Sequence, residues 1–120
     1  MSKVLIVDDY DDTRYLIRYL LEMYGFEVSE AANGLEALES VREHAPDLVL
    51  MDISMPKMDG LTAARKLREQ PQYAELPIIA ITAQSEGYRE PALEAGCNEL
   101  IAKPINIDDL RPVISKHLAN

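Results

Sequence analysis

Short apolar runs alternate along this chain with segments whose apolar residues recur at helical spacing. Each run is brief and almost entirely apolar, which is typical of parallel strands buried on both faces by crossover helices. The predicted strands are Val4 to Val7, Val28 to Ala31, Leu48 to Met51, Ile78 to Thr82 and Leu100 to Ala102. Because crossovers between parallel strands are right-handed, this pattern predicts an α/β fold with a five-stranded, doubly wound parallel sheet.

The helical segments between these strands differ in how clearly the sequence defines them. Three segments each have a predicted apolar helical face. The first face consists of Leu16, Ile17, Leu20 and Tyr24, the second of Leu35, Leu38 and Val41, and the third of Leu61, Ala64 and Leu67. A fourth segment contains Pro91 and a fifth contains Pro112. Proline fits a helix without loss of a backbone hydrogen bond only in the first turn. These two helices are therefore predicted either to begin late, near Tyr88 and Asp109, or to be distorted.

Composition limits the classes of protein to which the chain can belong. Its 120 residues, 48% hydrophobic and 28% charged, are expected to form one soluble domain over residues 1–120. No apolar stretch is long enough to cross a bilayer, and Val4 to Val7 is too short for a secretory signal, so a cytoplasmic location is expected. The single cysteine, Cys97, cannot form an internal disulfide. A net charge of −9 argues against direct binding to nucleic acid, which requires clustered Lys and Arg.

Polar residues follow or end four of the predicted strands. Asp8 and Asp9 follow the first strand, Asp52 follows the third, Thr82 ends the fourth and Lys103 follows the fifth. Ligand sites of such sheets lie at the carboxyl ends of the strands, so these side chains are expected to meet at one edge. Two carboxylates about 4 Å apart repel by roughly 4 kcal/mol at an effective dielectric constant near 20. A structural role does not explain that cost, and a functional site is predicted.

Something must offset the repulsion among these carboxylates, either raised carboxyl pKa values or a bound cation. Oxygen ligands without a nearby His or Cys favour a hard ion, for which Mg²⁺ is the natural candidate. Lys103 can reach the remaining negative charge, and Thr82 can donate a hydrogen bond. A carboxylate can act as the nucleophile in phosphoryl transfer, so the set of residues suits that chemistry.

Four sequence motifs contain these polar residues: Val7-Asp8-Asp9, Asp52-Ile53-Ser54-Met55-Pro56-Lys57-Met58-Asp59-Gly60, Ile81-Thr82-Ala83 and Ala102-Lys103-Pro104. Together these motifs resemble the receiver domains of two-component signalling. The resemblance covers essentially the whole chain, and it implies a CheY-like (flavodoxin-like) fold with strand order 2-1-3-4-5 and five helices. It also implies that Asp52 takes a phosphoryl group from a phosphohistidine of a sensor histidine kinase or a histidine phosphotransfer protein. The output would be altered binding to a downstream protein target.

The resemblance also implies a role for each residue around the metal. Asp9 would bind Mg²⁺ directly, Asp8 mainly through water, and Ser54 through its backbone carbonyl. Asp52 would be both a ligand and the phosphoacceptor.

On the other side of the phosphoryl group, Lys103 would contact the acyl phosphate and Thr82 would move onto the phosphoryl oxygens. The Lys103-Pro104 peptide bond is expected to be cis. Leu100 stands where receivers commonly carry a Tyr or Phe, two or three residues before the lysine. A leucine can change rotamer when Thr82 moves, but it has no hydroxyl to fix its position.

Two other functions remain open from the residues. A haloacid-dehalogenase-like phosphatase also uses an Asp nucleophile, a Thr or Ser, a Lys and Mg²⁺, but its pattern places a D-x-D element at the first strand. Here that strand is followed by adjacent Asp8-Asp9, so a signalling phosphoacceptor that acts only on its own phosphoryl group is favoured over an enzyme. The second alternative, a receiver that only binds partners, is disfavoured by the presence of all the acids together with Thr82 and Lys103.

Overall fold

The computed structural model describes residues 2–53, 59–83 and 87–118. In that part of the chain, five parallel strands form one sheet in the order β2-β1-β3-β4-β5. The strands are β1 (Lys3–Val7), β2 (Glu27–Ala31), β3 (Leu48–Asp52), β4 (Ile78–Thr82) and β5 (Glu99–Ala102). The helices are α1 (Asp11–Met23), α2 (Gly34–His44), α3 (Gly60–Arg68), α4 (Arg89–Glu94) and α5 (Ile107–Leu118), with a short 3₁₀ turn, η1 (Pro71–Tyr73). The predicted fold class and strand order are confirmed.

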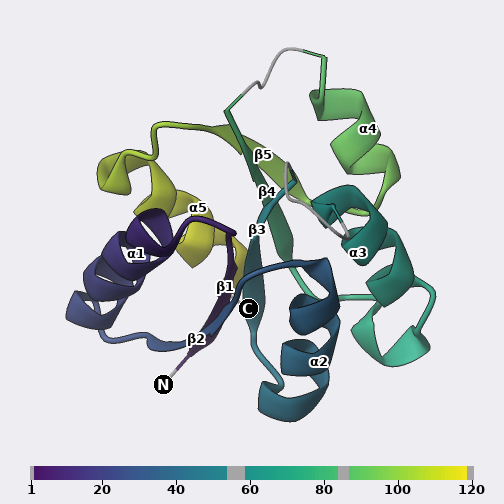
Figure 1. Cartoon of the computed structure of the whole chain (residues 1–120), viewed down its shortest axis with the longest axis horizontal. Coiled ribbons are helices and arrows are strands. Elements are labelled where there is room, and N and C mark those ends of the chain that lie inside the picture. The colour runs from purple at the N-terminus through teal and green to yellow at the C-terminus, as the bar shows by residue number, and fades with distance from the viewer. Residues whose placement is uncertain (1, 54–58, 84–86, 119–120) are drawn as a thin grey trace.

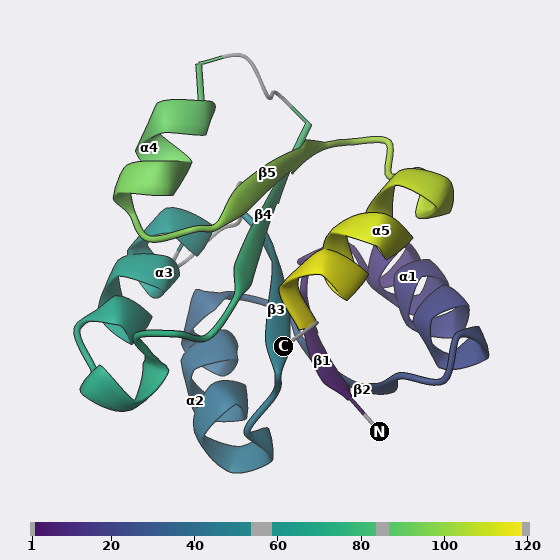
Figure 2. The same cartoon turned by 180° about the vertical axis from the view of Figure 1, so that it is seen from behind.

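Helices cover both faces of the sheet. Helices α1 and α5 pack on one face, and α2, α3 and α4 pack on the other (Figure 1). The same two layers are visible from behind in Figure 2. Within the described ranges, no helix is long and apolar enough to span a membrane.

The side chains of each strand alternate between two apolar clusters. In β1, Val4 and Ile6 face the layer of α1 and α5, whereas Leu5 and Val7 face the layer of α2 to α4. The central strands β3 and β4 are buried along their whole length. This burial explains why the strands are nearly continuous apolar runs in the sequence, and it gives the polar residues at their ends a rigid support.

Helix α1 buries a face that only partly overlaps the predicted one, because Ile17 is buried as predicted and Leu16 and Tyr24 are not. Its buried residues are Arg14, Ile17 and Leu21, whereas Leu16 is 59% exposed and Tyr24 is 40% exposed. Large apolar residues occupy a broad arc of this helix, and only one edge of the arc, with Ile17 and Leu21, faces the core, so the periodicity does not determine which part of the arc is buried. The core-facing stripe also includes Arg14, and a charged residue in the stripe makes it difficult to recognise from the sequence.

The predicted late start near the proline is confirmed for α4 and wrong for α5. Helix α4 begins late, at Arg89, which places Pro91 in the first turn where its missing N–H costs nothing. Helix α5 begins at Ile107, two residues before the predicted start, so Pro112 lies inside it. Asn106 explains the early start, because its side-chain oxygen accepts a hydrogen bond from the amide of Asp108 at 2.9 Å. Such a cap provides a partner for a free amide of the first turn.

Candidate functional site

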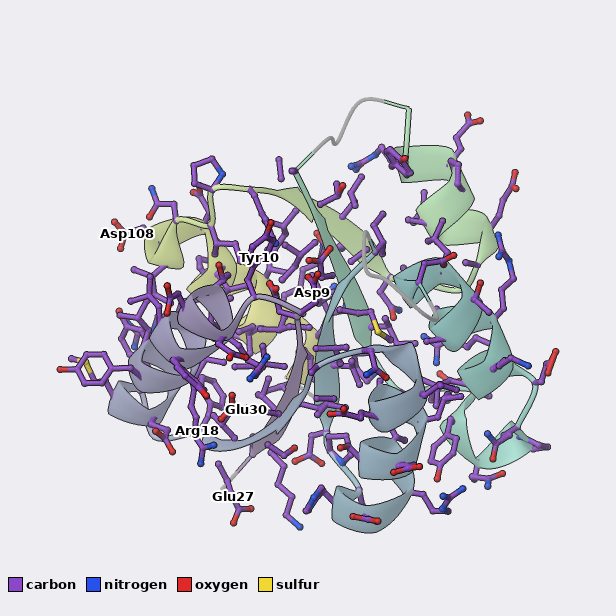
Figure 3. All side chains as sticks on the ribbon, in the orientation of Figure 1. Asp9, Tyr10, Arg18, Glu27, Glu30 and Asp108 are labelled. Carbon is purple, nitrogen blue, oxygen red and sulfur yellow. The ribbon has the colours of Figure 1, made fainter. Side chains whose placement is uncertain are left out.

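The predicted polar residues lie at one edge of the sheet. Asp8 follows β1, Asp52 is the last residue of β3, Thr82 is the last residue of β4 and Lys103 follows β5. Because all the strands run in the same direction, their carboxyl ends meet at this edge. Figure 3 shows Asp9 at the end of β1, on the same edge.

Three carboxylates form the centre of the site. Asp8, Asp9 and Asp52 each offer one oxygen, and these oxygens lie within 4.8 Å of one another. Asp8 and Asp52 are 2% and 3% exposed, and Asp9 is half-buried. The Oδ1 atom of Asp9 is buried and has no hydrogen-bond partner among the described residues. A buried oxygen without a donor, next to two other carboxylates, has the chemistry of a site for a hard cation.

Lys103 supplies a positive charge between two of these carboxylates. Its Nζ atom lies 3.0 Å from Oδ2 of Asp52 and 3.2 Å from Oδ2 of Asp8. Burial lowers the pKa of Lys103, but the hydrogen bond and charge of Asp52, and then those of Asp8, outweigh this effect and raise the pKa above its ordinary value. The backbone amide of Lys103 also donates to the carbonyl of Thr82 at 2.8 Å, and the Lys103-Pro104 bond is cis, as the resemblance implied.

Thr82 is fully buried at the end of β4, one residue beyond Ile81, which pairs with Asp52. Its place beside Asp52 and Lys103 follows directly from the strand register. Leu100 is half-buried in β5 and packs against the cluster under α2 to α4. Ser54, the expected backbone ligand, lies outside the described residues.

A close contact between α3 and β3 determines where Asp52 stands. A Cβ atom built on Gly60 would lie 2.4 Å from the backbone oxygen of Asp52 and 2.8 Å from Cα of Ile53. Only glycine leaves room for the first turn of α3 at this distance. The side chain of Asp59 caps the same turn by accepting a hydrogen bond from the amide of Thr62 at 2.8 Å.

The loop between β1 and α1 is held by hydrogen bonds on both sides. The amide of Asp8 donates to the carbonyl of Ala31 at 3.1 Å, and the amide of Tyr10 donates to Oδ1 of Asp8 at 2.9 Å. Nη1 of Arg14 donates to the carbonyl oxygen of Asp8 at 2.8 Å. Arg14 was not among the predicted site residues, because its burial and its contacts come from residues distant in the sequence.

An apolar groove of about 480 Å³ opens beside the carboxylates. Leu16 and Leu20 of α1 line one wall, and Pro104 and Ile105, after β5, line the other. Lys103 also lines the groove, so the groove leads to the charged site. The exposure of Leu16, unexpected from the sequence, contributes to this groove.

The arrangement suits transfer of an anionic group to a carboxylate. Asp52 presents a nucleophilic oxygen, Lys103 lies beside it to neutralise negative charge, and the acidic cluster can hold a divalent cation. These are the requirements of phosphoryl transfer, in which positioning and neutralisation of charge provide most of the catalysis.

Comparison with known proteins identifies the family. The family described as response regulator receiver domain matches residues 4–115. The polar-differentiation response regulator DivK of Brucella anthropi is 38% identical over 120 residues, covering 99% of this chain and 98% of that protein.

Solved structures agree with this match over nearly the whole chain. The chemotaxis protein CheY4 of Vibrio cholerae has a TM-score of 0.92 at 32% identity, covering 98% of this chain and 99% of its own. The receiver domain of a sensor histidine kinase from Pseudomonas aeruginosa, with a magnesium ion coordinated in its active-site cleft, has a TM-score of 0.91 at 32% identity, covering 99% of this chain and 98% of its own. This chain therefore belongs to the response-regulator receiver domains, a family of signalling proteins.

Proposed function

We propose that Asp52 accepts a phosphoryl group from a phosphohistidine of a partner protein and that the phosphorylated chain signals through altered protein binding. One observation carries the proposal: a nearly fully buried Asp52 lies in a cluster of three carboxylates, with its Oδ2 atom 3.0 Å from the ammonium of Lys103. A buried carboxylate in this setting is costly, and a nucleophilic role explains its presence.

The residues of the acidic cluster fit a magnesium ion. Asp8, Asp9 and Asp52 would hold it. The family resemblance adds the backbone carbonyl of Ser54 as a further ligand. The buried Oδ1 of Asp9, which lacks a donor within the described part of the chain, supports this assignment. A bound Mg²⁺ supplies neutralisation of charge on the phosphoryl oxygens. The magnesium ion in the cleft of the related Pseudomonas receiver domain supports the same choice of metal.

The chain's own residues account for the remaining chemistry. An oxygen of the Asp52 carboxylate attacks the phosphorus, the bond from phosphorus to the histidine nitrogen breaks, and the released imidazole takes a proton from solvent. Lys103 neutralises charge on the transferred group, and Thr82 donates a hydrogen bond to one of its oxygens. The result is an acyl phosphate on Asp52.

The groove beside the carboxylates supports a protein as the phosphodonor. Its walls, Leu16 and Leu20 on one side and Pro104 and Ile105 on the other, are apolar and reach the site through Lys103. A sensor histidine kinase or a histidine phosphotransfer protein would place its histidine beside Asp52 from this groove. The proposal includes a cytoplasmic location and a downstream protein that distinguishes the two phosphorylation states.

Radiolabelled acetyl phosphate tests this function. The wild-type protein should become labelled with Mg²⁺ present and remain unlabelled with EDTA, and Asp52→Asn should remain unlabelled under both conditions. Asp12→Asn, which changes an exposed aspartate in the first turn of α1, is the matched control and should label as the wild type does.

Each alternative predicts a different result. Persistent labelling of Asp52→Asn would overturn the assignment of the acceptor. Failure of the wild-type protein to bind Mg²⁺ would favour a receiver that only binds partners. Repeated turnover of simple phosphomonoesters would revive the phosphatase.

A further inference from the structure

Arg14 is a buried cation on a helix face that otherwise packs into the core. It is 8% exposed and shares the buried face of α1 with Ile17 and Leu21. Those two residues lie three and seven positions further along the helix, on the same face. An apolar side chain would therefore be expected at position 14.

The guanidinium of Arg14 makes a hydrogen bond with each of its three nitrogens. Nε donates to Oε1 of Glu30 at 2.7 Å, Nη1 donates to the carbonyl oxygen of Asp8 at 2.8 Å, and Nη2 donates to Oδ1 of Asp11 at 2.6 Å. These partners belong to β2, to the loop after β1 and to the first turn of α1. One side chain thus joins three segments around the acidic cluster.

Burying an arginine is expensive, and replacing a buried ion pair by apolar residues is often neutral or stabilising. The contacts of Arg14 are therefore poorly explained by stability alone. The carbonyl that Arg14 holds belongs to the peptide that joins Asp8 to Asp9. On the other side of Asp8, its amide donates to the carbonyl of Ala31 at 3.1 Å. The two bonds fix the backbone from which both carboxylates project.

We propose that Arg14 is a positioning residue that holds the Asp8-Asp9 peptide in the orientation needed to bind the metal. The inference rests on the proposed function, because it assigns Arg14 to the same magnesium site. Residues that orient metal ligands without touching the metal commonly change metal affinity by about 10-fold to 100-fold when they are mutated. Glu30 anchors Arg14 from β2, so it contributes to the same effect.

Arg18 provides a matched control on the same helix. It also forms an ion pair with Glu30, but its side chain is 40% exposed, and it pairs in addition with Glu22, in the last turn of α1 and away from the acidic loop. Figure 3 shows Arg18 and Glu30 together between α1 and β2. Arg18→Met therefore removes an arginine and a contact to Glu30 without releasing the carbonyl of Asp8.

Isothermal titration with Mg²⁺, combined with the melting temperature of the metal-free protein, tests the proposal. Arg14→Met should weaken Mg²⁺ binding by about 10-fold to 100-fold. Arg14→Lys keeps the positive charge but not the three hydrogen bonds that the guanidinium makes, so the Mg²⁺ affinity of this variant should fall between those of the wild type and Arg14→Met. Arg18→Met should bind Mg²⁺ as the wild type does. Glu30→Gln, which weakens the anchor of Arg14, should lower the affinity in the same direction as Arg14→Met.

The outcomes separate this inference from the proposed function. A wild-type protein that does not bind Mg²⁺ would overturn the magnesium site itself. A wild type that binds, with Arg14→Met and Arg14→Lys binding equally well, would overturn only the role of Arg14. A purely structural role would lower the metal-free melting temperature and leave the Mg²⁺ affinity of the folded protein unchanged. If Arg14→Met does not fold, Arg14→Lys and Glu30→Gln decide between the same outcomes.

Discussion

Replacing Asp52 by asparagine should stabilise the metal-free protein. Two unit charges 4.8 Å apart, the largest separation in the cluster, repel by about 3.5 kcal/mol at an effective dielectric constant near 20. Neutralising Asp52 removes its repulsion with both Asp8 and Asp9, about 7 kcal/mol in total. It also removes an attraction of about 5.5 kcal/mol to the Lys103 ammonium 3.0 Å away. The difference, about 1.5 kcal/mol, favours the folded variant and corresponds to a rise of about 4–9 °C in melting temperature for a domain of this size.

Thermal unfolding in EDTA measures this difference directly. Asp12→Asn removes the same amount of charge from an exposed position outside the cluster, so it shows whether overall net charge is the cause. It should give no stabilisation, because an acid in the first turn of a helix is favourable. Addition of Mg²⁺ should raise the melting temperature of the wild type more than that of Asp52→Asn, because the variant lacks a charged ligand. A melting temperature of Asp52→Asn at or below that of the wild type in EDTA would refute the reasoning.

Cys97, Gly60 and Glu30 provide independent tests of the packing around the sheet. Burial raises the pKa of the Cys97 thiol to about 11 from an ordinary value of 9.0, so at neutral pH a thiol reagent should modify the folded protein about 100-fold more slowly than the denatured chain. Equal rates would contradict the burial of this thiol. Gly60→Ala places a methyl group 2.4 Å from the backbone oxygen of Asp52, and denaturant unfolding should show a loss of about 1–3 kcal/mol. An unchanged unfolding midpoint would contradict the close approach of α3 to β3. Burial disfavours the charge of Glu30, but hydrogen bonds from Arg18 and Arg14 outweigh it and hold the pKa below its ordinary 4.5. The stability that this charge contributes is present above about pH 4.5 and is lost as the pH falls through the pKa of Glu30 in the folded protein. The free energy of unfolding of the wild type should therefore exceed that of Glu30→Gln by less at acidic pH than at neutral pH. A difference in unfolding free energy that does not change with pH would count against these ion pairs.

The strands and the residues at their ends could be predicted because one physical constraint determines both. A strand buried on two faces must be a short apolar run, and a parallel sheet brings the carboxyl ends of its strands to one edge. Each observed strand therefore lies within one residue of its predicted bounds at either end. The same constraint brings Asp8, Asp52 and Lys103 together from distant parts of the sequence.

The orientation of α1 and the role of Arg14 could not be predicted, because they depend on tertiary contacts. Apolar side chains cover a broad arc of α1, and how the helix packs on the sheet decides that the edge with Ile17 and Leu21 is the buried one. The partner of Arg14 on β2, Glu30, is 16 residues away, and no local pattern links the two. The early start of α5 had a local signal in Asn106, which is a favourable capping residue.

Locating the phosphoryl group tests the central assignment most directly. After reaction with acetyl phosphate and Mg²⁺, borohydride reduces an aspartyl phosphate to homoserine, and peptide mass spectrometry then identifies the position. We expect homoserine at Asp52 in the wild type with Mg²⁺ and at no position when EDTA replaces the metal. Homoserine at Asp8 or Asp9, or no homoserine at Asp52 with Mg²⁺ present, would contradict the assignment of Asp52 as the phosphoacceptor.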